Sequence, residues 1–257
     1  MRQQPLTGFV LHQKPYRETR SLTYFFSREF GLVNGIGKNN LPLFVPISLF
    51  ATGKSELKSF SQSQIMHPVP SLYGQAQFAG LYLNELSVKL LSPEVACEAL
   101  WQAYQRSLLN LANLTHCQTL STSDGLKLIL RQFEQKLFEE LGLAIDFNHD
   151  IQGEPILPHL HYRYQLQAGF IPVVMAENTG KGQPLDVFVG RALQDWQAYL
   201  DNSLENSLLE DKNSLSLKTA VLLLNPMGRL YRQIVDNLVN YQLLQSRELW
   251  QDLKKYQ

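Results

Sequence analysis

The sequence predicts an α+β protein, in which a small antiparallel barrel or sandwich comes first and a mainly α-helical region follows. Two observations support this fold class. Before the segment "HPVPSLYG", short apolar and polar runs alternate and are bounded by Gly, Pro, Asn or Ser, as in β-strands. After it, apolar residues recur at helical spacing. We therefore expect one domain at 1–72 and a helical domain at 73–257.

About five strands are predicted in the first domain. Their sequences are "TGFVLHQ", "SLTYFFS", "GLVNGIG", "LFVPISLFAT" and "ELKSFSQ". A cluster of charged residues, Lys14, Arg17, Glu18 and Arg20, separates the first two. We expect this cluster in the loop that joins the two strands.

Three helices are predicted next. The first has apolar residues at helical spacing from Ala79 to Leu90. The second, "PEVACEALWQAYQRSLLNLAN", opens with Pro93, a residue that favours the first helical turn. For the third, Ser123 is the expected N-cap and Gly142 the expected stop.

The remainder of the chain combines a short hairpin with further helices. The stretches "HLHYRYQL" and "GFIPVVM" alternate on either side of Gln167, which predicts a small hairpin module at about 145–180. Asn225 and Pro226 are expected to begin the helix "MGRLYRQIVDNLVNY", and "SRELWQDLKKY" is expected to be the last helix. The polar stretch 201–214 is expected to be a mobile insertion.

Composition limits the classes of function. Lys plus Arg and Asp plus Glu number 23 each, so the formal net charge is zero. A neutral chain has no overall field that attracts nucleic acid or an anionic membrane, so any basic site must be local.

The cysteines and the apolar runs indicate a compartment. Cys97 and Cys117 both fall in apolar helical patterns, which indicates buried thiols in a reducing environment. The N-terminus lacks the apolar core of a signal peptide, and the longest apolar run, "AVLLL", is too short to cross a bilayer. We expect a soluble, cytoplasmic protein without a membrane partner.

Motifs for catalysis and metal binding fail on inspection. The fragment "GKS" ends like a phosphate-binding loop, but Ser48 stands where that motif needs glycine. His149, His159 and His161 lack the supporting cysteine pair of a structural zinc site, so we expect no metal and no cofactor. No GxSxG or HExxH motif is present, and we expect no enzymatic activity. A hydrolase would need a carboxylate or histidine with a strongly perturbed pKa in a cleft.

Five segments, in this order and at compatible spacing, resemble the bacterial recombination mediator RecO family: "GFVLHQKPYRETRSLTYFFSREFGLV", "GLYLNELSVKLL", "LRQFEQKLFEELGLAIDF", "HYRYQLQAGFI" and "SRELWQDL". The resemblance implies an N-terminal OB-fold and a helical domain with a small zinc-like module. It also implies a nucleoid-associated DNA repair protein that binds single- and double-stranded DNA and anneals complementary strands. Its implied partners are single-stranded-DNA-binding protein, the mediator RecR and, indirectly, the recombinase RecA.

An OB-fold binds strands across one sheet face and its connecting loops. Basic residues on converging loops would form a local positive groove on the neutral chain, and an exposed aromatic ring there could stack a base. Tyr16 is the ring that we expect to be exposed. The predicted nucleic-acid-binding residues are Lys14, Tyr16, Arg17, Arg20, Lys38, Lys54 and Lys58.

The resemblance also implies a site in the helical domain for the acidic C-terminal tail of single-stranded-DNA-binding protein. Such a tail needs an apolar pocket rimmed by cations. Arg131, beside an apolar stripe that includes Phe133, is expected at the edge of such a groove without being buried. Arg247 is a second candidate, with an ion pair that fixes the last helix as the alternative.

Departures from the family pattern remove positive charge. Relatives carry a basic stretch where this chain has only Lys38, and lysines where it has Gln242 and Gln245. DNA affinity is then lower or is carried by other residues, for which the candidates are Arg163, Arg229 and Arg232. The remaining alternative is an OB-fold module for another ligand, such as structured RNA.

Overall fold

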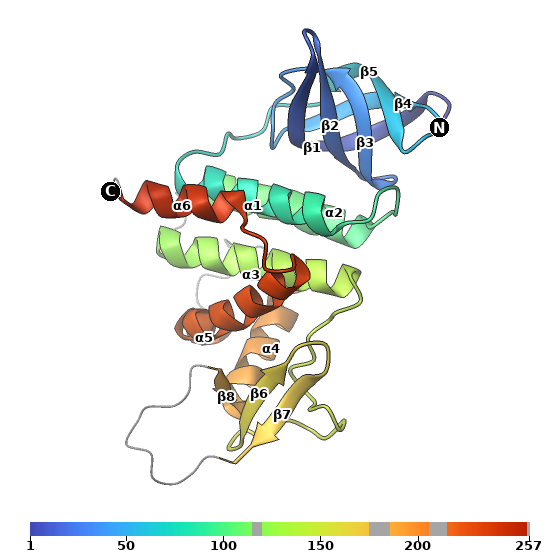
Figure 1. Ribbon diagram of the computed structural model, residues 1–257. Helices are drawn as coiled ribbons and strands as arrows, with labels where there is room; N and C mark the ends of the chain where they lie inside the picture. The colour runs from blue at the N-terminus through green and yellow to red at the C-terminus, as the bar shows by residue number, and fades with distance from the viewer. Residues whose placement is uncertain (115–119, 175–185, 206–214, 256–257) are drawn as a thin grey trace. The chain divides into compact units, whose positions relative to one another are not determined.

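The computed structural model describes residues 1–114, 120–174, 186–205 and 215–255 (Figure 1). Contacts divide the chain into two compact units, Met1–Thr115 with Gln242–Gln257, and His116–Tyr241. Cys117, most of the predicted insertion and the end of the predicted hairpin module lie outside the described residues. The two units do not divide at residue 72, and the domain boundary drawn there from secondary structure stays a prediction.

The first unit contains a closed barrel with the strand order β1-β2-β3-β5-β4. Antiparallel pairing of β1 with β4 closes it, and β3 and β5 pair in parallel. This is the OB-fold arrangement, so the predicted fold class is confirmed. The strands are β1 (Gln4–Arg17), β2 (Arg20–Ser27), β3 (Gly31–Lys38), β4 (Pro46–Thr52) and β5 (Leu57–Ile65).

The barrel interior is filled by alternate residues of all five strands. Phe25, Val33 and Ile47 have no exposed surface. The ring of Phe60 lies directly over Gly35, where a Cβ atom would come within 2.7 Å of three atoms of that ring. The glycine in β3 therefore makes room for the largest side chain that β5 sends into the core.

Three helices complete the first unit: α1 (Gln75–Leu90), α2 (Glu98–Asn113) and α6 (Gln245–Lys255). Helix α2 begins later than predicted, because Glu94 adopts a positive φ of 59° that no helix continues and Cys97, a buried thiol, is the N-cap. Helix α6 packs along α1 (Figure 1). The Glu85 carboxylate of α1 accepts hydrogen bonds from the backbone N–H groups of Gln245 and Ser246, both at 2.9 Å, at the start of α6.

A buried amide joins this helical layer to the barrel. The register of β1 against β2 shifts between Val10 and His12, which leaves Leu11 at a bulge. Asn84 of α1 donates a hydrogen bond to the Leu11 carbonyl oxygen at 2.8 Å, and its own side-chain oxygen accepts one from the Tyr104 hydroxyl of α2 at 2.6 Å. One side chain thus satisfies polar groups from a strand and from a second helix.

The second unit combines three helices with a three-stranded sheet of order β7-β6-β8. The predicted hairpin is present as β6 and β7, but β8 and α4 were not predicted. A strand of three residues carries too short a pattern to recognise. The elements are α3 (Thr122–Glu140), β6 (His161–Gln165), β7 (Gly169–Val173), β8 (Val187–Val189), α4 (Gly190–Glu205) and α5 (Leu215–Leu238).

Helix ends in this unit differ in part from the expectation. The N-cap of α3 is Ser121, whose side chain accepts a hydrogen bond from Asp124 N, and not Ser123. Gly142 has a φ of 72° just past the C-cap of α3, as the predicted stop requires. Pro226 lies inside α5 and not in its first turn. Ala220 and Leu224 before Pro226 and Met227 after it are all buried, so α5 packs on both sides of the missing N–H donor.

We predict that Gly31→Ala destabilises the protein more than Gly142→Ala. Both glycines have a positive φ, 64° and 72°, which costs an alanine about 1 kcal/mol. A Cβ at Gly31 would also overlap the Val95 carbonyl oxygen, whereas nothing lies within 4 Å of one at Gly142. Chemical denaturation should therefore show a loss of about 1 kcal/mol for Gly142→Ala and about 3 kcal/mol for Gly31→Ala. Equal losses would mean that the loop around Val95 moves away without cost.

Candidate nucleic-acid interface

The charged cluster between the first two strands lies in a β-hairpin and not in the expected loop. Lys14 pairs with Leu22 and Arg17 with Arg20, so only Glu18 and Thr19 form the turn. Strand β1 pairs with β4 no further than Phe9 and continues beyond it with β2 as partner. The part of β1 beyond Phe9 therefore has solvent-exposed positions, where charged side chains are tolerated. This explains why the apolar–polar alternation of the sequence breaks there although the chain remains a strand.

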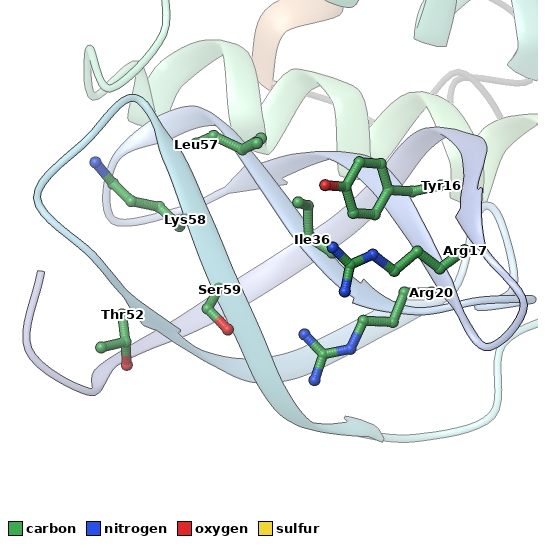
Figure 2. Close-up of a pocket in the computed structure, with 8 residues that line it drawn as sticks. All are labelled: Tyr16, Arg17, Arg20, Ile36, Thr52, Leu57, Lys58 and Ser59. Atoms are coloured by element: carbon green, nitrogen blue, oxygen red, sulfur yellow. The ribbon is translucent and has the colours of Figure 1, made fainter.

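A pocket of about 310 Å³ lies where this hairpin meets the barrel (Figure 2). The hairpin contributes one wall, β3 and β5 contribute the floor, and the end of β4 contributes the far edge. Figure 2 shows the side chains of Tyr16 and the two arginines extending from the hairpin toward the strands. The lining residues are Tyr16, Arg17, Arg20, Ile36, Thr52, Leu57, Lys58 and Ser59.

Two like charges face each other in the hairpin wall. Arg17 and Arg20 are direct cross-strand partners, and both are exposed. Within the described ranges neither forms an ion pair with a carboxylate. Like charges placed opposite each other destabilise a strand pair. The pocket wall therefore carries positive charge that an anionic ligand would neutralise.

Tyr16 is the exposed ring of the pocket, as predicted. Its side chain is 51% exposed, and the guanidinium carbon of Arg17 lies 5.3 Å from the ring centre. This cation–π contact orients the ring and leaves much of its surface open. Phe25 and Phe26 of the neighbouring strand β2 have no exposed surface and belong to the core.

The other predicted lysines on this face lie beside pocket residues. Lys38 is the register partner of Arg20, Lys54 lies in the turn that follows β4, and both are exposed. Lys14 is exposed further along the hairpin, with its ammonium group 5.9 Å from the ring centre of Tyr24. Lys38 and Lys54 are thus neighbours of pocket residues in register or in sequence, whereas Lys14 lies over Tyr24, and none of the three lines the pocket itself.

Lys58 has a different role from the one expected. It lies two residues before Phe60 on the same face of β5, is only 4% exposed, and its ammonium group lies 2.6 Å from the Glu94 carboxylate. It also donates a hydrogen bond to the Ser55 carbonyl oxygen. Lys58 therefore forms a buried ion pair that fixes the loop before α2, and its charge is already neutralised. The spacing of two residues between Lys58 and Phe60 was the sequence signal for this inward direction, because residues two apart in a strand share a face.

His12 adds no charge to the hairpin at neutral pH. Burial lowers the pKa of this imidazole below its ordinary value, and the nearby charge of Lys14 lowers it further. The positive charge of this face therefore comes from lysine and arginine, which stay charged across the physiological pH range.

The residues predicted to bind a partner protein are less accessible than expected. Phe133 has no exposed surface, and the Arg131 side chain is 12% exposed. The Arg131 guanidinium is paired with Glu134 at 2.9 Å and lies 5.3 Å from the ring centre of Tyr231. Arg131 thus does not stand exposed at a groove edge. Arg247 is partly exposed and lies over the Tyr82 ring, 5.5 Å from its centre.

Neither a metal site nor a membrane span is found in the described part of the chain. No group of three or more His, Cys, Asp or Glu side chains gathers there in a way that could hold a metal ion. Nor does any helix among these residues have the length and apolar character that a membrane span requires.

Comparisons with known proteins give one consistent result. The family model "Recombination protein O C terminal" matches residues 74–194. A "DNA repair protein RecO" from Alteromonas mediterranea is 34% identical over 179 residues, which cover 65% of this chain and 73% of the relative. The protein of the same name from Tolumonas auensis is 35% identical over 66% of this chain and 73% of its own length. That from Pasteurella multocida is 34% identical over 73% and 80%.

We predict that Lys58→Met lowers stability while Lys54→Met does not. Methionine keeps the apolar stem but leaves the Glu94 carboxylate without its cation. Because the Glu94 side chain is 34% exposed, the cost should be about 2 kcal/mol and less than for a fully buried pair. Lys54 is exposed, so its replacement should change the free energy of unfolding by less than about 0.5 kcal/mol. Similar unfolding curves for the two variants would contradict the structural role of Lys58.

Proposed function

The chain belongs to the RecO family of recombination proteins, and from this premise we propose that it is a recombination mediator that binds single- and double-stranded DNA. Its role in DNA repair and recombination follows from the family. The finer proposal is that it anneals complementary strands and assists recombinase loading onto DNA coated by single-stranded-DNA-binding protein. The proposal requires no catalytic step.

The observation that carries the proposal is the pair Arg17 and Arg20 on the open face of an OB-fold. The two guanidinium groups stand on neighbouring strands without a carboxylate partner among the described residues. A guanidinium group binds phosphate through two parallel hydrogen bonds, so this pair matches a nucleic-acid backbone. A phosphate between the two charges attracts both of them and offsets their mutual repulsion.

The proposed binding is independent of sequence. Contacts to phosphate and sugar position a protein on nucleic acid but carry no sequence information, and the pocket offers cations, an aromatic ring and hydroxyl groups. A mediator must act on any damaged stretch of DNA, for which this chemistry is suitable.

The implied protein partners are part of the same proposal. They are single-stranded-DNA-binding protein through its acidic tail, RecR, and indirectly RecA. Of the residues predicted for the tail, Arg247 is partly exposed. Binding at Arg131 and Phe133 requires a change of packing, since both side chains are largely buried.

We predict a strong salt dependence of DNA binding. If about four phosphates are neutralised, the logarithm of the association constant should fall against the logarithm of salt concentration with a slope of about −3 for single strands. Titrations of single-stranded DNA, duplex DNA and RNA by fluorescence anisotropy measure it. Affinity that does not respond to salt, or that depends strongly on one sequence, would contradict the proposal. Tighter binding of structured RNA would favour another OB-fold function.

We predict that the double variant Arg17→Ala, Lys54→Ala weakens DNA binding and slows annealing of strands coated with single-stranded-DNA-binding protein. Loss of two phosphate contacts should reduce the steepness of the salt dependence by about 1.4. The melting temperature should stay nearly unchanged, because exposed charges contribute little to stability. Lys89→Ala, an exposed lysine of α1 outside the pocket, is the matched control. A large fall in the melting temperature would show that Arg17 or Lys54 is structural.

A further inference from the structure

The pocket between the hairpin and the barrel is small and is lined by unlike kinds of group. Its volume of about 310 Å³ lies at the low end of the range of roughly 300–1,000 Å³ that small-ligand sites occupy. A volume at this end of the range suits one small ligand group, such as a single nucleotide. A phosphate backbone alone would need only the cations, so the other groups call for a separate explanation.

The pocket exposes two apolar side chains on its strands, at positions where solvent-facing residues are normally polar. Leu57 is 42% exposed, and Ile36, which lies next to Ser59 in the β3–β5 register, is partly exposed. Both contribute to the pocket floor with Ser59, and Thr52 adds a second hydroxyl group at the far edge. A flat apolar floor beside hydrogen-bonding groups matches a nucleobase, which has apolar faces and polar edges.

The Tyr16 ring is held in one orientation before any ligand stacks on it. Arg17 lies over the ring at 5.3 Å from its centre, and yet half of the side chain remains exposed. Because the guanidinium covers one face, the ring has a preferred orientation and a ligand loses less conformational entropy when it stacks on the rest. Arg20 extends from the neighbouring strand into the same pocket (Figure 2).

We propose that this pocket binds one unpaired nucleotide of a DNA strand, with its base against Tyr16 and the floor of Ile36 and Leu57, and its phosphate at Arg17 and Arg20. The inference rests on the proposed function and names which form of DNA the site selects. A base within a duplex has both faces covered by its neighbours, and exposing one requires unstacking. Duplex DNA therefore meets this face through phosphates alone, and the proposed pocket favours single strands over duplex.

The test compares Tyr16→Ala with Tyr16→Phe on three ligands: a single-stranded oligonucleotide of mixed sequence, the matching duplex, and a sugar–phosphate strand without bases. Tyr16→Ala should weaken single-strand binding about tenfold, which corresponds to about 1.4 kcal/mol. It should change binding of the duplex and of the base-free strand less than twofold. Tyr16→Phe should bind like the unaltered protein, because phenylalanine keeps the stacking face. Tyr73→Ala removes a ring that is 78% exposed but does not line the pocket, and should change nothing.

Each remaining outcome overturns the inference. Unchanged single-strand affinity in Tyr16→Ala would show that no base stacks there. An equal loss on all three ligands, at an unchanged melting temperature, would show that Tyr16 acts only on the phosphate contacts of Arg17. If the unaltered protein binds none of the three ligands, the proposed function fails as well, so the two failures are distinguishable.

Discussion

The hydrogen bonds of Asn84 determine how the first unit is built. The bulge at Leu11 leaves a strand carbonyl that the ladder does not satisfy, and Asn84 reaches it from α1 while it accepts from Tyr104 of α2. Bulges bend a strand and increase its twist. Here the bulge precedes the residues of β1 that form the hairpin wall. The helices thus hold one side of the barrel at the point from which the β1–β2 hairpin departs, and the face with the pocket stays open.

Charged residues have two roles in this barrel: some form structural ion pairs and others remain exposed to a ligand. Their surroundings in the fold decide which role each one has. Lys58 and Arg17 are both cations close to the same pocket. Lys58 is buried against Glu94 and holds the loop before α2, so its charge contributes to the fold. Arg17 is exposed opposite Arg20, so its charge is available to a ligand. The cost of the like-charge pair is small at an exposed hairpin, which is why the chain can carry it.

The barrel was predictable because alternation of apolar and polar residues follows burial in a strand, and each of the five predicted strands overlaps an observed one, although β1 is longer than predicted. The errors arose where local pattern and tertiary context disagree. Charge at Lys14 and Arg17 indicated a loop, since nothing local shows that a strand continues beyond its barrel partners. Pro226 indicated a helix start, because proline is favoured in the first turn and disfavoured inside a helix. It lies inside α5, and the packing of that helix involves residues that are distant in sequence. For the site, Tyr16 was predictable as an exposed ring, whereas the ion pair of Lys58 depends on Glu94, which folding brings close from a distant loop.

The return of α6 to α1 has a consequence for biosynthesis. The first unit includes residues on both sides of the second, so the ribosome delivers its last helix only after residues 116–241 have emerged. At roughly 5–20 residues per second, this delay is on the order of ten seconds. Until then Glu85 has no helix to cap, and the Phe78 ring lacks Trp250, its later neighbour at 6.4 Å. The part of α1 that contacts α6 therefore stays uncovered on the nascent chain, although the barrel and α2, which α1 also contacts, are already synthesised.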